Sequence, residues 1–219
     1  MNKLGIIAFC GSKFSGKSTS ATLFRDLIGA PTEEIAIAGH LKEACARVFG
    51  VDYNKFIDPN LKEVELDEYA LLTSDNLKAL MKEFDVTDYK FDKHIRLHMG
   101  RILRTPRTLL QYIGTEVLHP IDPLIHAKKA LRKKDPAKLT VITDLRFVAE
   151  FEYFKQLENF MPVYVKNTSA ETAASVDGHA SERQYEQFKG KCYLLDNDDR
   201  VVVALKASLN RLVLEMYHD

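Results

Sequence analysis

One octapeptide constrains this sequence more than any other feature. Residues 11–18 read G-S-K-F-S-G-K-S, which fits the pattern G-x-x-x-x-G-K-[ST] in full. An apolar run, Leu4–Cys10, stands directly before it, and an amphipathic helical pattern begins near Lys17. From ordinary residue frequencies, this octapeptide should arise in roughly one of a hundred chains of this length. The context of strand, loop and helix therefore predicts a loop whose backbone N–H groups and helix N-terminus hold phosphate oxygens.

The residue types in this loop predict a nucleoside triphosphate as the ligand. Lys17 should reach the β- and γ-phosphates, and the Ser18 hydroxyl should bind Mg²⁺, which prefers oxygen ligands. The predicted cofactor-binding residues of the loop are Gly11, Ser12, Lys13, Phe14, Ser15, Gly16, Lys17, Ser18 and Thr19. The loop alone does not define an activity, because motors, switches and kinases share it. A GTPase switch is disfavoured, since Asn54-Lys55 is not followed at the right place by the aspartate of an N-K-x-D signature.

Five short apolar runs predict the strands of one sheet. They are Leu4–Cys10, Glu34–Ala38, Leu139–Thr143, Met161–Val165 and Cys192–Leu195. Most of these runs are near-continuous, as expected for parallel strands that helices cover on both faces. Helical patterns between the runs predict helices over about 17–28, 41–49, 106–118, 123–134 and 200–216. The predicted fold class is therefore α/β, with helices layered on a parallel sheet.

Length and composition limit the class of protein. The chain has 219 residues, of which 46% are hydrophobic and 28% charged, so we expect one domain with a substantial core. Its 31 basic and 31 acidic residues balance, which argues against broad affinity for nucleic acid or an anionic membrane. Three cysteines with no close pair argue against a disulfide framework and a cysteine-based zinc site. The apolar start is too short for a membrane span or an export signal, so a cytoplasmic location is expected.

The region between the second and third predicted strands is unusually long. It spans about a hundred residues, too many for an ordinary crossover, and we expect it to carry a substrate-binding insertion. Its charge is uneven, because residues 52–92 hold eleven acidic and five basic side chains, whereas residues 93–107 hold five basic ones and no acid. We interpret Lys93, Arg96 and Arg101 as charges on solvated helix faces.

A second polar segment follows the third predicted strand. The strand ends at Asp144, where a carboxylate would bind Mg²⁺ directly or through water, opposite the phosphate loop. Arg146 comes two residues later, and a guanidinium can bind a phosphate through two nitrogens. Because parallel strands end at one edge of a sheet, we expect Asp144 and Arg146 to lie near the loop.

Six segments then form an ordered set along the chain. They are G-x-K-x-x-G-K at Gly11–Lys17, A-G-x-[LI]-K at Ala38–Lys42, R-x-L-[LM]-Q-x-x-G-T at Arg107–Thr115, D-x-R with a later acid at Asp144, Arg146 and Glu150, H-x-[ST]-E at His179–Glu182, and a last strand ending in Asn197-Asp198. In this order they resemble the deoxynucleoside monophosphate kinases of tailed bacteriophages, within the broader group of P-loop nucleoside monophosphate kinases. The resemblance covers most of the chain and leaves residues 52–100 unmatched.

The resemblance implies ATP-dependent phosphorylation of deoxynucleoside monophosphates to diphosphates. It implies a three-layer P-loop kinase fold in a single domain, residues 1–219, with a five-stranded parallel sheet, helices on both faces, an inserted substrate-binding region and a lid. The core would comprise about 1–39, 120–167 and 191–219, the monophosphate-binding region about 40–119, and the lid about 168–190. The implied substrate-binding residues are Gly39, Lys42, Arg107, Gln111, Gly114, Thr115, Arg146 and Glu150. The implied catalytic residues are Lys13, Lys17, Asp144 and Arg146, the metal ligands are Ser18 and Asp144, and Asn197 would bind the cofactor near adenine.

The implied cofactors are ATP and Mg²⁺, and the implied partner is a deoxynucleoside monophosphate, with neither nucleic acid nor membrane. A homodimer is left open, and a phage origin would place the protein in the host cytoplasm. Phe14 stands where some relatives carry arginine, and no tryptophan follows Thr115 as it does in some relatives, so base preference does not transfer. Arg183, Lys189 and Lys191 are the lid candidates. The alternatives are a P-loop kinase for another small phosphorylated acceptor, of the phosphomevalonate or dephospho-coenzyme A type, and a non-catalytic ATP-gated binding protein.

Overall fold

The computed structural model describes residues 5–87, 92–177 and 184–218. Contacts between residues divide the chain into two compact units, of which unit 1 comprises Met1–Ile37 and Leu131–Asp219 and unit 2 comprises Ala38–Ala130. Unit 2 is therefore an insertion in the sequence of unit 1. Within the described residues, no helix combines the length and the apolar character that crossing a membrane requires.

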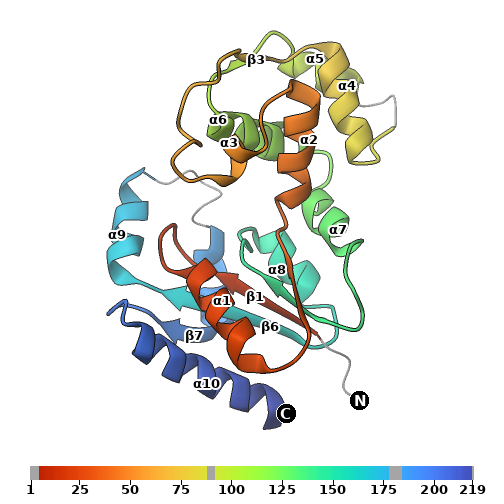
Figure 1. Ribbon diagram of the computed structural model, residues 1–219. Coiled ribbons are helices and arrows are strands. Elements are labelled where there is room, and N and C mark those ends of the chain that lie inside the picture. Colours follow the sequence, from red (N-terminus) through yellow and green to blue (C-terminus); the bar gives the residue numbers. More distant parts are fainter. Residues whose placement is uncertain (1–4, 88–91, 178–183, 219) are drawn as a thin grey trace. The chain divides into compact units, whose positions relative to one another are not determined.

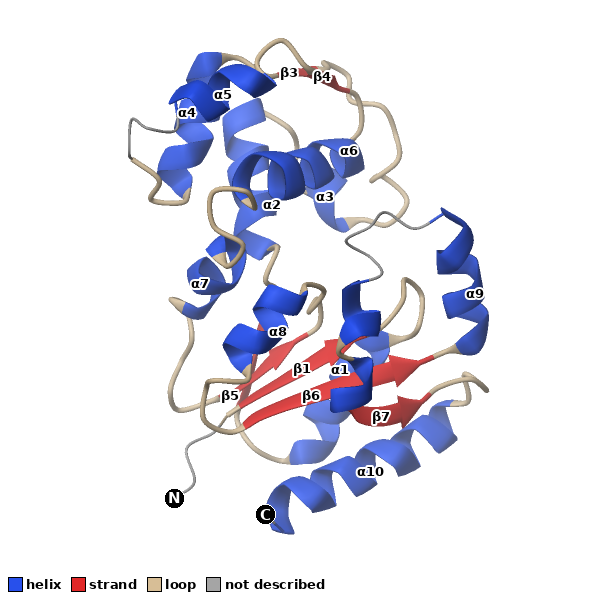
Figure 2. Ribbon diagram, turned by 180° about the vertical axis from the view of Figure 1, so that it is seen from behind, coloured by secondary structure: helices blue, strands red, loops and turns tan. Residues whose placement is uncertain are grey.

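Unit 1 is built on a five-stranded parallel sheet. Its strands are β1 (Ile6–Cys10), β2 (Thr32–Ile35), β5 (Leu139–Ile142), β6 (Phe160–Lys166) and β7 (Tyr193–Asp196). They lie in the order β2-β5-β1-β6-β7, and each neighbouring pair is parallel. Figure 2 shows β5, β1, β6 and β7 in this sheet. All five residues of the central strand β1 are buried. The carboxyl end of this strand leads directly into the loop that begins at Gly11.

Helices cover both faces of this sheet. On one face, α1 (Lys17–Ile28) and α10 (Val202–His218) lie side by side (Figure 1). Phe9 of β1, Phe24 and Leu209 belong to one buried hydrophobic cluster. On the other face, α8 (Val148–Phe154) buries Phe151, whose ring stacks on Phe188 with centroids 4.5 Å apart. The remaining elements of unit 1 are α9 (Thr168–Asp177) and two short 3₁₀ helices, η4 (Gln184–Gln187) and η5 (Lys189–Lys191). The predicted α/β class, with a five-stranded parallel sheet between helices, is confirmed.

The second strand differs from its prediction. The apolar run predicts a strand at Glu34–Ala38, whereas β2 begins and ends earlier, at Thr32–Ile35. β2 is an edge strand with three polar residues before Ile35. The Glu33 carboxylate accepts hydrogen bonds from Thr140 Oγ1 and from the Asp135 N–H, both at 2.9 Å. A search for apolar runs misses such a strand, since its pairing depends on backbone and polar contacts.

Helix ends marked by glycine lie where they are predicted. α1 ends at Gly29 with φ 64°, and α2 (Gly39–Phe49) ends at Gly50 with φ 66°, both in the left-handed region that glycine favours. The predicted helix over 106–118 is α6 (Pro106–Gln111), continued without a break by the π-helix η2 (Tyr112–Leu118). The expected helix over 123–134 is shorter at both ends, since α7 spans Ile125–Leu131.

Unit 2 is mostly helical and has its own core. Its other elements are α3 (Asn54–Ile57), α4 (Ser74–Glu83), α5 (Asp92–His98) and an antiparallel pair of strands, β3 (Ala70–Leu71) and β4 (Ile102–Leu103). Phe56, Leu80 and Leu109 are fully buried in a hydrophobic cluster to which most of these elements contribute. Burial of this cluster gives unit 2 a source of stability within its own sequence.

The uneven charge of unit 2 is partly paired within the unit. Arg107 contacts Glu63 through Nε, Arg104 lies 3.9 Å from Glu65, and Lys55 Nζ lies 2.6 Å from Asp67. The acidic segment that contains Glu63 therefore lies along the basic segment that ends at Arg107. Lys93, Arg96 and Arg101, the charges predicted to be solvated, take no part in these three pairs and are exposed.

Candidate active site

At two positions, the loop between β1 and α1 has a backbone conformation that only glycine adopts easily. Gly11 has φ 137° and Gly16 has φ 97°. A Cβ atom on Gly11 would lie 2.6 Å from the carbonyl oxygen of Val165, on the neighbouring strand β6. The Ser12 carbonyl accepts a hydrogen bond from the Ser15 N–H at 3.2 Å, and both serines are fully buried. The loop is therefore a tight turn packed on the carboxyl ends of β1 and β6.

The Lys17 ammonium group lies inside this turn. Its Nζ donates hydrogen bonds to the carbonyl oxygens of Gly11 at 3.0 Å and Ser12 at 2.5 Å. Lys17 is also the first residue of α1, a helix of 12 residues, so it stands at the positive end of the helix dipole. Ser18 and Thr19 follow in the first turn and are exposed. An anion at this helix terminus would meet an ammonium group, the backbone N–H groups of the first turn and two hydroxyls.

The tip of the loop is exposed and aromatic. Phe14 is 74% exposed and has φ 65°, a left-handed conformation that is strained for a residue with a Cβ atom. The Nζ of Lys13 lies over the Phe14 ring, 5.0 Å from its centroid. This cation–π contact holds the Lys13 charge at the loop tip.

Asn197 lies against the phosphate loop. Its Nδ2 donates to the Ser15 carbonyl at 2.8 Å, and a Cβ atom on Gly16 would lie 2.4 Å from that nitrogen. Its backbone is fixed as well, because its N–H donates to the Lys166 carbonyl at 3.0 Å and its carbonyl accepts from the buried Asn167 at 2.8 Å. The side chain therefore fixes the peptide between Ser15 and Gly16. Its predicted position near adenine stays a prediction.

The next residue, Asp198, joins the ends of β6 and β7. Its carboxylate accepts hydrogen bonds from Lys166 Nζ at 2.6 Å, the Thr168 N–H at 2.5 Å and Thr168 Oγ1 at 3.1 Å. The hydrogen bond from Lys166 lowers the pKa of Asp198 to about 2. The carboxylate is therefore ionised at neutral pH, and its hydrogen bonds to Lys166 and Thr168 stabilise the turn that contains Asn197.

The segment after β5 lies at the same edge of the sheet as the loop, since β5 pairs in parallel with β1. Asp144 Oδ1 accepts a hydrogen bond from the Ile37 N–H at 2.8 Å, and Arg146 is exposed. Glu150 is 2% exposed, and its Oε2 accepts from the backbone N–H groups of Arg146 at 3.2 Å and Phe147 at 3.1 Å. Burial raises the pKa of Glu150 to about 8. This carboxyl group caps α8 and shapes the segment that carries Arg146, and little of it is accessible to a substrate.

The predicted metal ligands have the right chemistry for Mg²⁺. Ser18 and Asp144 belong to segments that follow the adjacent parallel strands β1 and β5. Mg²⁺ commonly takes one or two protein oxygens together with phosphate oxygens and water, so one hydroxyl and one carboxylate fit it. Across the described ranges, no group of three or more His, Cys, Asp and Glu side chains could hold a metal ion by itself. Metal binding at Ser18 and Asp144 stays a prediction.

Six of the predicted substrate-binding residues lie in unit 2, and all six are partly exposed. Gly39 and Lys42 are among the first four residues of α2, and the other four lie on the continuous helix formed by α6 and η2, namely Arg107, Gln111, Gly114 and Thr115. Arg107 and Gln111 are four residues apart and therefore share one helix face. The structure thus gathers the predicted residues of unit 2 on two helices, while those of unit 1 lie at the carboxyl edge of its sheet.

Gly114 allows a close contact between helices. A Cβ atom there would lie 3.0 Å from Leu41 Cδ2 and 3.6 Å from His126 Nε2. The Gly114 carbonyl accepts the π-helical hydrogen bond from the His119 N–H at 3.1 Å. Packing against α2 is therefore a sufficient reason for glycine at this position, whatever its part in substrate binding.

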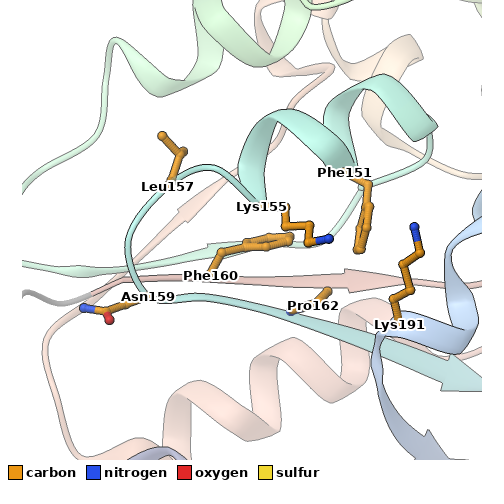
Figure 3. Close-up of a pocket in the computed structure, with 7 residues that line it drawn as sticks. All are labelled: Phe151, Lys155, Leu157, Asn159, Phe160, Pro162 and Lys191. Carbon is orange, nitrogen blue, oxygen red and sulfur yellow. The ribbon is translucent and has the colours of Figure 1, made fainter.

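A pocket of about 410 Å³ in unit 1 lies away from the phosphate loop. Figure 3 shows its lining residues, which are Phe151, Lys155, Leu157, Asn159, Phe160, Pro162 and Lys191. Phe160 begins β6, so the pocket lies toward the amino end of that strand. Ligands of open parallel sheets bind outside the carboxyl ends of the strands, so this pocket is not part of the candidate site.

The predicted lid is described only in part. His179–Glu182 and Arg183 lie outside the described residues. Lys189 Nζ lies 5.6 Å from the centroid of the Tyr164 ring, and Lys191 Nζ lies 3.3 Å from Glu152. Both lysines therefore contact other residues of unit 1, and their part in a lid stays a prediction.

Sequence reasoning missed three groups that position the predicted residues. Glu63 pairs with Arg107, the Ile37 N–H donates to Asp144, and the Asn197 amide holds the loop at Ser15. A backbone N–H has no residue signature. The acidic segment that contains Glu63 was the one available signal, because it precedes the basic segment of opposite charge.

No protein-family model matches this sequence. A protein of Acanthamoeba polyphaga mimivirus, with the name "Putative deoxynucleotide monophosphate kinase", is 26% identical over 210 residues, which cover 90% of this chain and 90% of that protein. Among solved structures, TT1252 from Thermus thermophilus is similar with a TM-score of 0.44 and 16% identity, over 98% of each chain. The chain is therefore a distant relative of the mimivirus protein over nearly its whole length.

Proposed function

We propose that this protein transfers the γ-phosphoryl group of ATP to a deoxynucleoside monophosphate. The observation that carries this proposal is the turn at Gly11–Gly16, with the Lys17 ammonium folded into it at the N-terminus of α1. The mimivirus relative supports a nucleotide kinase. The motifs at Ala38–Lys42 and Arg107–Thr115 support a monophosphate acceptor, through their resemblance to the phage enzymes.

Phosphoryl transfer depends on alignment and on positive charge around the transferred group, and it needs no covalent nucleophile. Lys17 would bind the β- and γ-phosphate oxygens of ATP, and Lys13 and Arg146 would add charge where it develops. The acceptor phosphate offers an ionised oxygen near neutral pH, so no general base is required. Glu150 and Asn197 would act by position, since they fix the backbone at Arg146 and in the loop.

Ser18 and Asp144 would hold Mg²⁺ together with phosphate oxygens. When bound, Mg²⁺ neutralises charge on the β- and γ-phosphate oxygens. The Ile37 N–H donates a hydrogen bond to Asp144 Oδ1 and thereby orients the carboxylate. Removal of divalent cations with EDTA should abolish turnover, and added Mg²⁺ should restore it.

Arg107 would bind the phosphate of the acceptor in unit 2. Glu63 now pairs with its guanidinium, so an acceptor phosphate must compete with that carboxylate. We therefore expect Arg107→Ala to raise the KM for the monophosphate more than the KM for ATP. Glu63→Gln, which removes the competing charge, should lower the KM for the monophosphate. Equal effects of Arg107→Ala on both KM values would contradict the proposal that Arg107 binds the acceptor.

The test of the proposal is an assay of ADP release with each of the four common deoxynucleoside monophosphates and without acceptor. We expect turnover that depends on the acceptor and disappears in Lys17→Ala. Turnover only with another phosphorylated acceptor, such as phosphomevalonate or dephospho-coenzyme A, would replace the proposed substrate. ATP binding without turnover of any acceptor would favour an ATP-gated binding protein instead.

A further inference from the structure

Two cysteines that are far apart in the sequence meet beside the phosphate loop. Cys10 is the last residue of β1, directly before Gly11, and is fully buried. Cys192 directly precedes β7 and is half-buried. Their Sγ atoms lie 3.9 Å apart. All three cysteines are free thiols in the structure, but the spacing of Cys10 and Cys192 in the sequence does not reveal their contact across the sheet.

We propose that Cys10 and Cys192 form a site of reversible oxidation, at which an intramolecular disulfide ties the segment before β7 to the base of the phosphate loop. The third cysteine, Cys45, is fully buried in unit 2 and takes no part. The disulfide itself does not depend on the proposed function, whereas its effect on ATP does.

The two thiols are chemically unequal, which assigns the order of the reaction. Their mutual hydrogen bond and burial raise the pKa of Cys10, and the same hydrogen bond lowers the pKa of Cys192. Cys192 is also the more exposed of the two residues. Since the thiolate is the nucleophile in disulfide exchange, Cys192 reacts first.

The oxidant is a small-molecule disulfide, such as oxidised glutathione. The Cys192 thiolate attacks one of its sulfur atoms, forms a mixed disulfide and releases one thiolate. Cys10 then loses its thiol proton and attacks Cys192 Sγ, which forms the bond between the two cysteines and releases the second thiol. The protein loses two electrons and two protons, and the small disulfide becomes two thiols.

Bond formation requires the sulfur atoms to approach from 3.9 Å to about 2.05 Å. Cys10 is held in the central strand, which pairs with β5 on one side and β6 on the other. Cys192 lies in a turn after η5, where its N–H donates to the Lys189 carbonyl at 3.2 Å. Figure 3 shows the preceding residue, Lys191, reaching the pocket beside β6 from this segment. The shift therefore falls on residues 189–192 rather than on β1.

A shift at Cys192 acts on the phosphate loop by two routes. Cys10 is bonded directly to Gly11, so strain in the disulfide reaches the start of the turn. β7 connects Cys192 to Asn197, whose amide holds the Ser15 carbonyl. We therefore expect the oxidised protein to bind ATP several-fold more weakly than the reduced protein.

The experiment uses the full chain, treated with oxidised glutathione and then assayed for disulfides and for ATP binding. Under denaturing conditions, the number of free thiols should fall from three to one, and peptide mapping should link Cys10 to Cys192. Dithiothreitol should restore both the thiols and the ATP affinity. Cys192→Ser should prevent the link and keep the affinity constant, and Cys45→Ser is the matched control that should behave like the wild type.

Three results would contradict parts of this inference. A glutathione adduct on Cys192 without the internal link would overturn the disulfide site, and so would a link that involves Cys45. A complete link with unchanged ATP affinity would overturn the effect on the loop. If neither form binds ATP while the link still forms, the proposed function fails and the oxidation site stands.

Discussion

Replacement of Glu150 by glutamine should stabilise the protein relative to the wild type. This gain in stability should be larger at neutral and alkaline pH than at mildly acidic pH. Glu150 is 2% exposed, and burial raises its pKa from 4.5 to about 8. Glutamine keeps a side-chain oxygen that accepts the hydrogen bonds from the Arg146 and Phe147 N–H groups, and it does not titrate. The substitution therefore removes the cost of keeping the buried carboxyl group protonated above its unfolded pKa, without removing the helix cap.

The sign and size of the effect follow from proton linkage. Between the two pKa values the folded protein keeps the proton on Glu150 and the unfolded chain has lost it, so a rise in pH favours unfolding. The free energy of unfolding should fall by about 1.4 kcal/mol for each pH unit in this range. From about pH 5.5 to about pH 7.5, the wild type should lose about 2.5 kcal/mol relative to Glu150→Gln. The loss should level off as the pH rises past the folded pKa.

The assay is urea unfolding, followed by circular dichroism, of both proteins at several pH values in this range. The matched control is Glu152→Gln on the same helix, whose side chain is 46% exposed and pairs with Lys191. Its difference from the wild type should not grow with pH. If the stability difference between Glu150→Gln and the wild type is also constant, the buried carboxyl group is already ionised in the folded protein. That result would refute the raised pKa of Glu150.

Three further predictions concern the loop and unit 2. Lys17→Ala should reduce turnover by orders of magnitude and leave the circular dichroism spectrum unchanged. A near-normal turnover rate in this variant would contradict a catalytic role of Lys17. Gly16→Ala should abolish ATP binding, measured by calorimetry, because φ is 97° and the new Cβ atom would lie 2.4 Å from Asn197 Nδ2; Asn197→Ala should rescue it only in part, since the backbone strain remains. Burial lowers the pKa of His98 and His119, so unit 2 should lose stability as the pH falls below about 6.5, where the unfolded histidines take up protons. Hydrogen-exchange protection factors in unit 2 that do not fall in mild acid would contradict this.

Short-range signals predicted most of unit 1. The loop and the start of α1 were predicted because all of their determinants lie between Gly11 and Lys17, within seven residues. Strand β1 was predicted because it is buried on both faces and is therefore apolar throughout. β2 was displaced in the prediction because Glu33, a polar residue of an edge strand, carries part of its pairing. Local patterns are reliable where burial is complete on both sides.

The contacts that position the site were not predictable from local patterns. The Asn197 amide and the Ser15 carbonyl are 182 residues apart, as are the sulfur atoms of Cys10 and Cys192. The cap of α8 was hidden for another reason, since Phe147 occupies the N-cap position where serine, threonine, aspartate or asparagine is the usual signal. Such contacts depend on which strands are neighbours, and the sequence alone does not specify that order.

The chain enters the inserted unit after Ile37 and returns at Leu131, and the strands on either side of this excursion, β2 and β5, are neighbours in the sheet. Each junction between the two units is crossed once by the chain, so an exchange of residues 38–130 requires only two crossover points in the sequence. If unit 2 selects the acceptor and unit 1 binds ATP, as proposed, a lineage can acquire a new acceptor by replacing residues 38–130 while unit 1 stays unchanged. A chimaera made by transplanting that stretch between relatives is therefore a practical route to altered specificity.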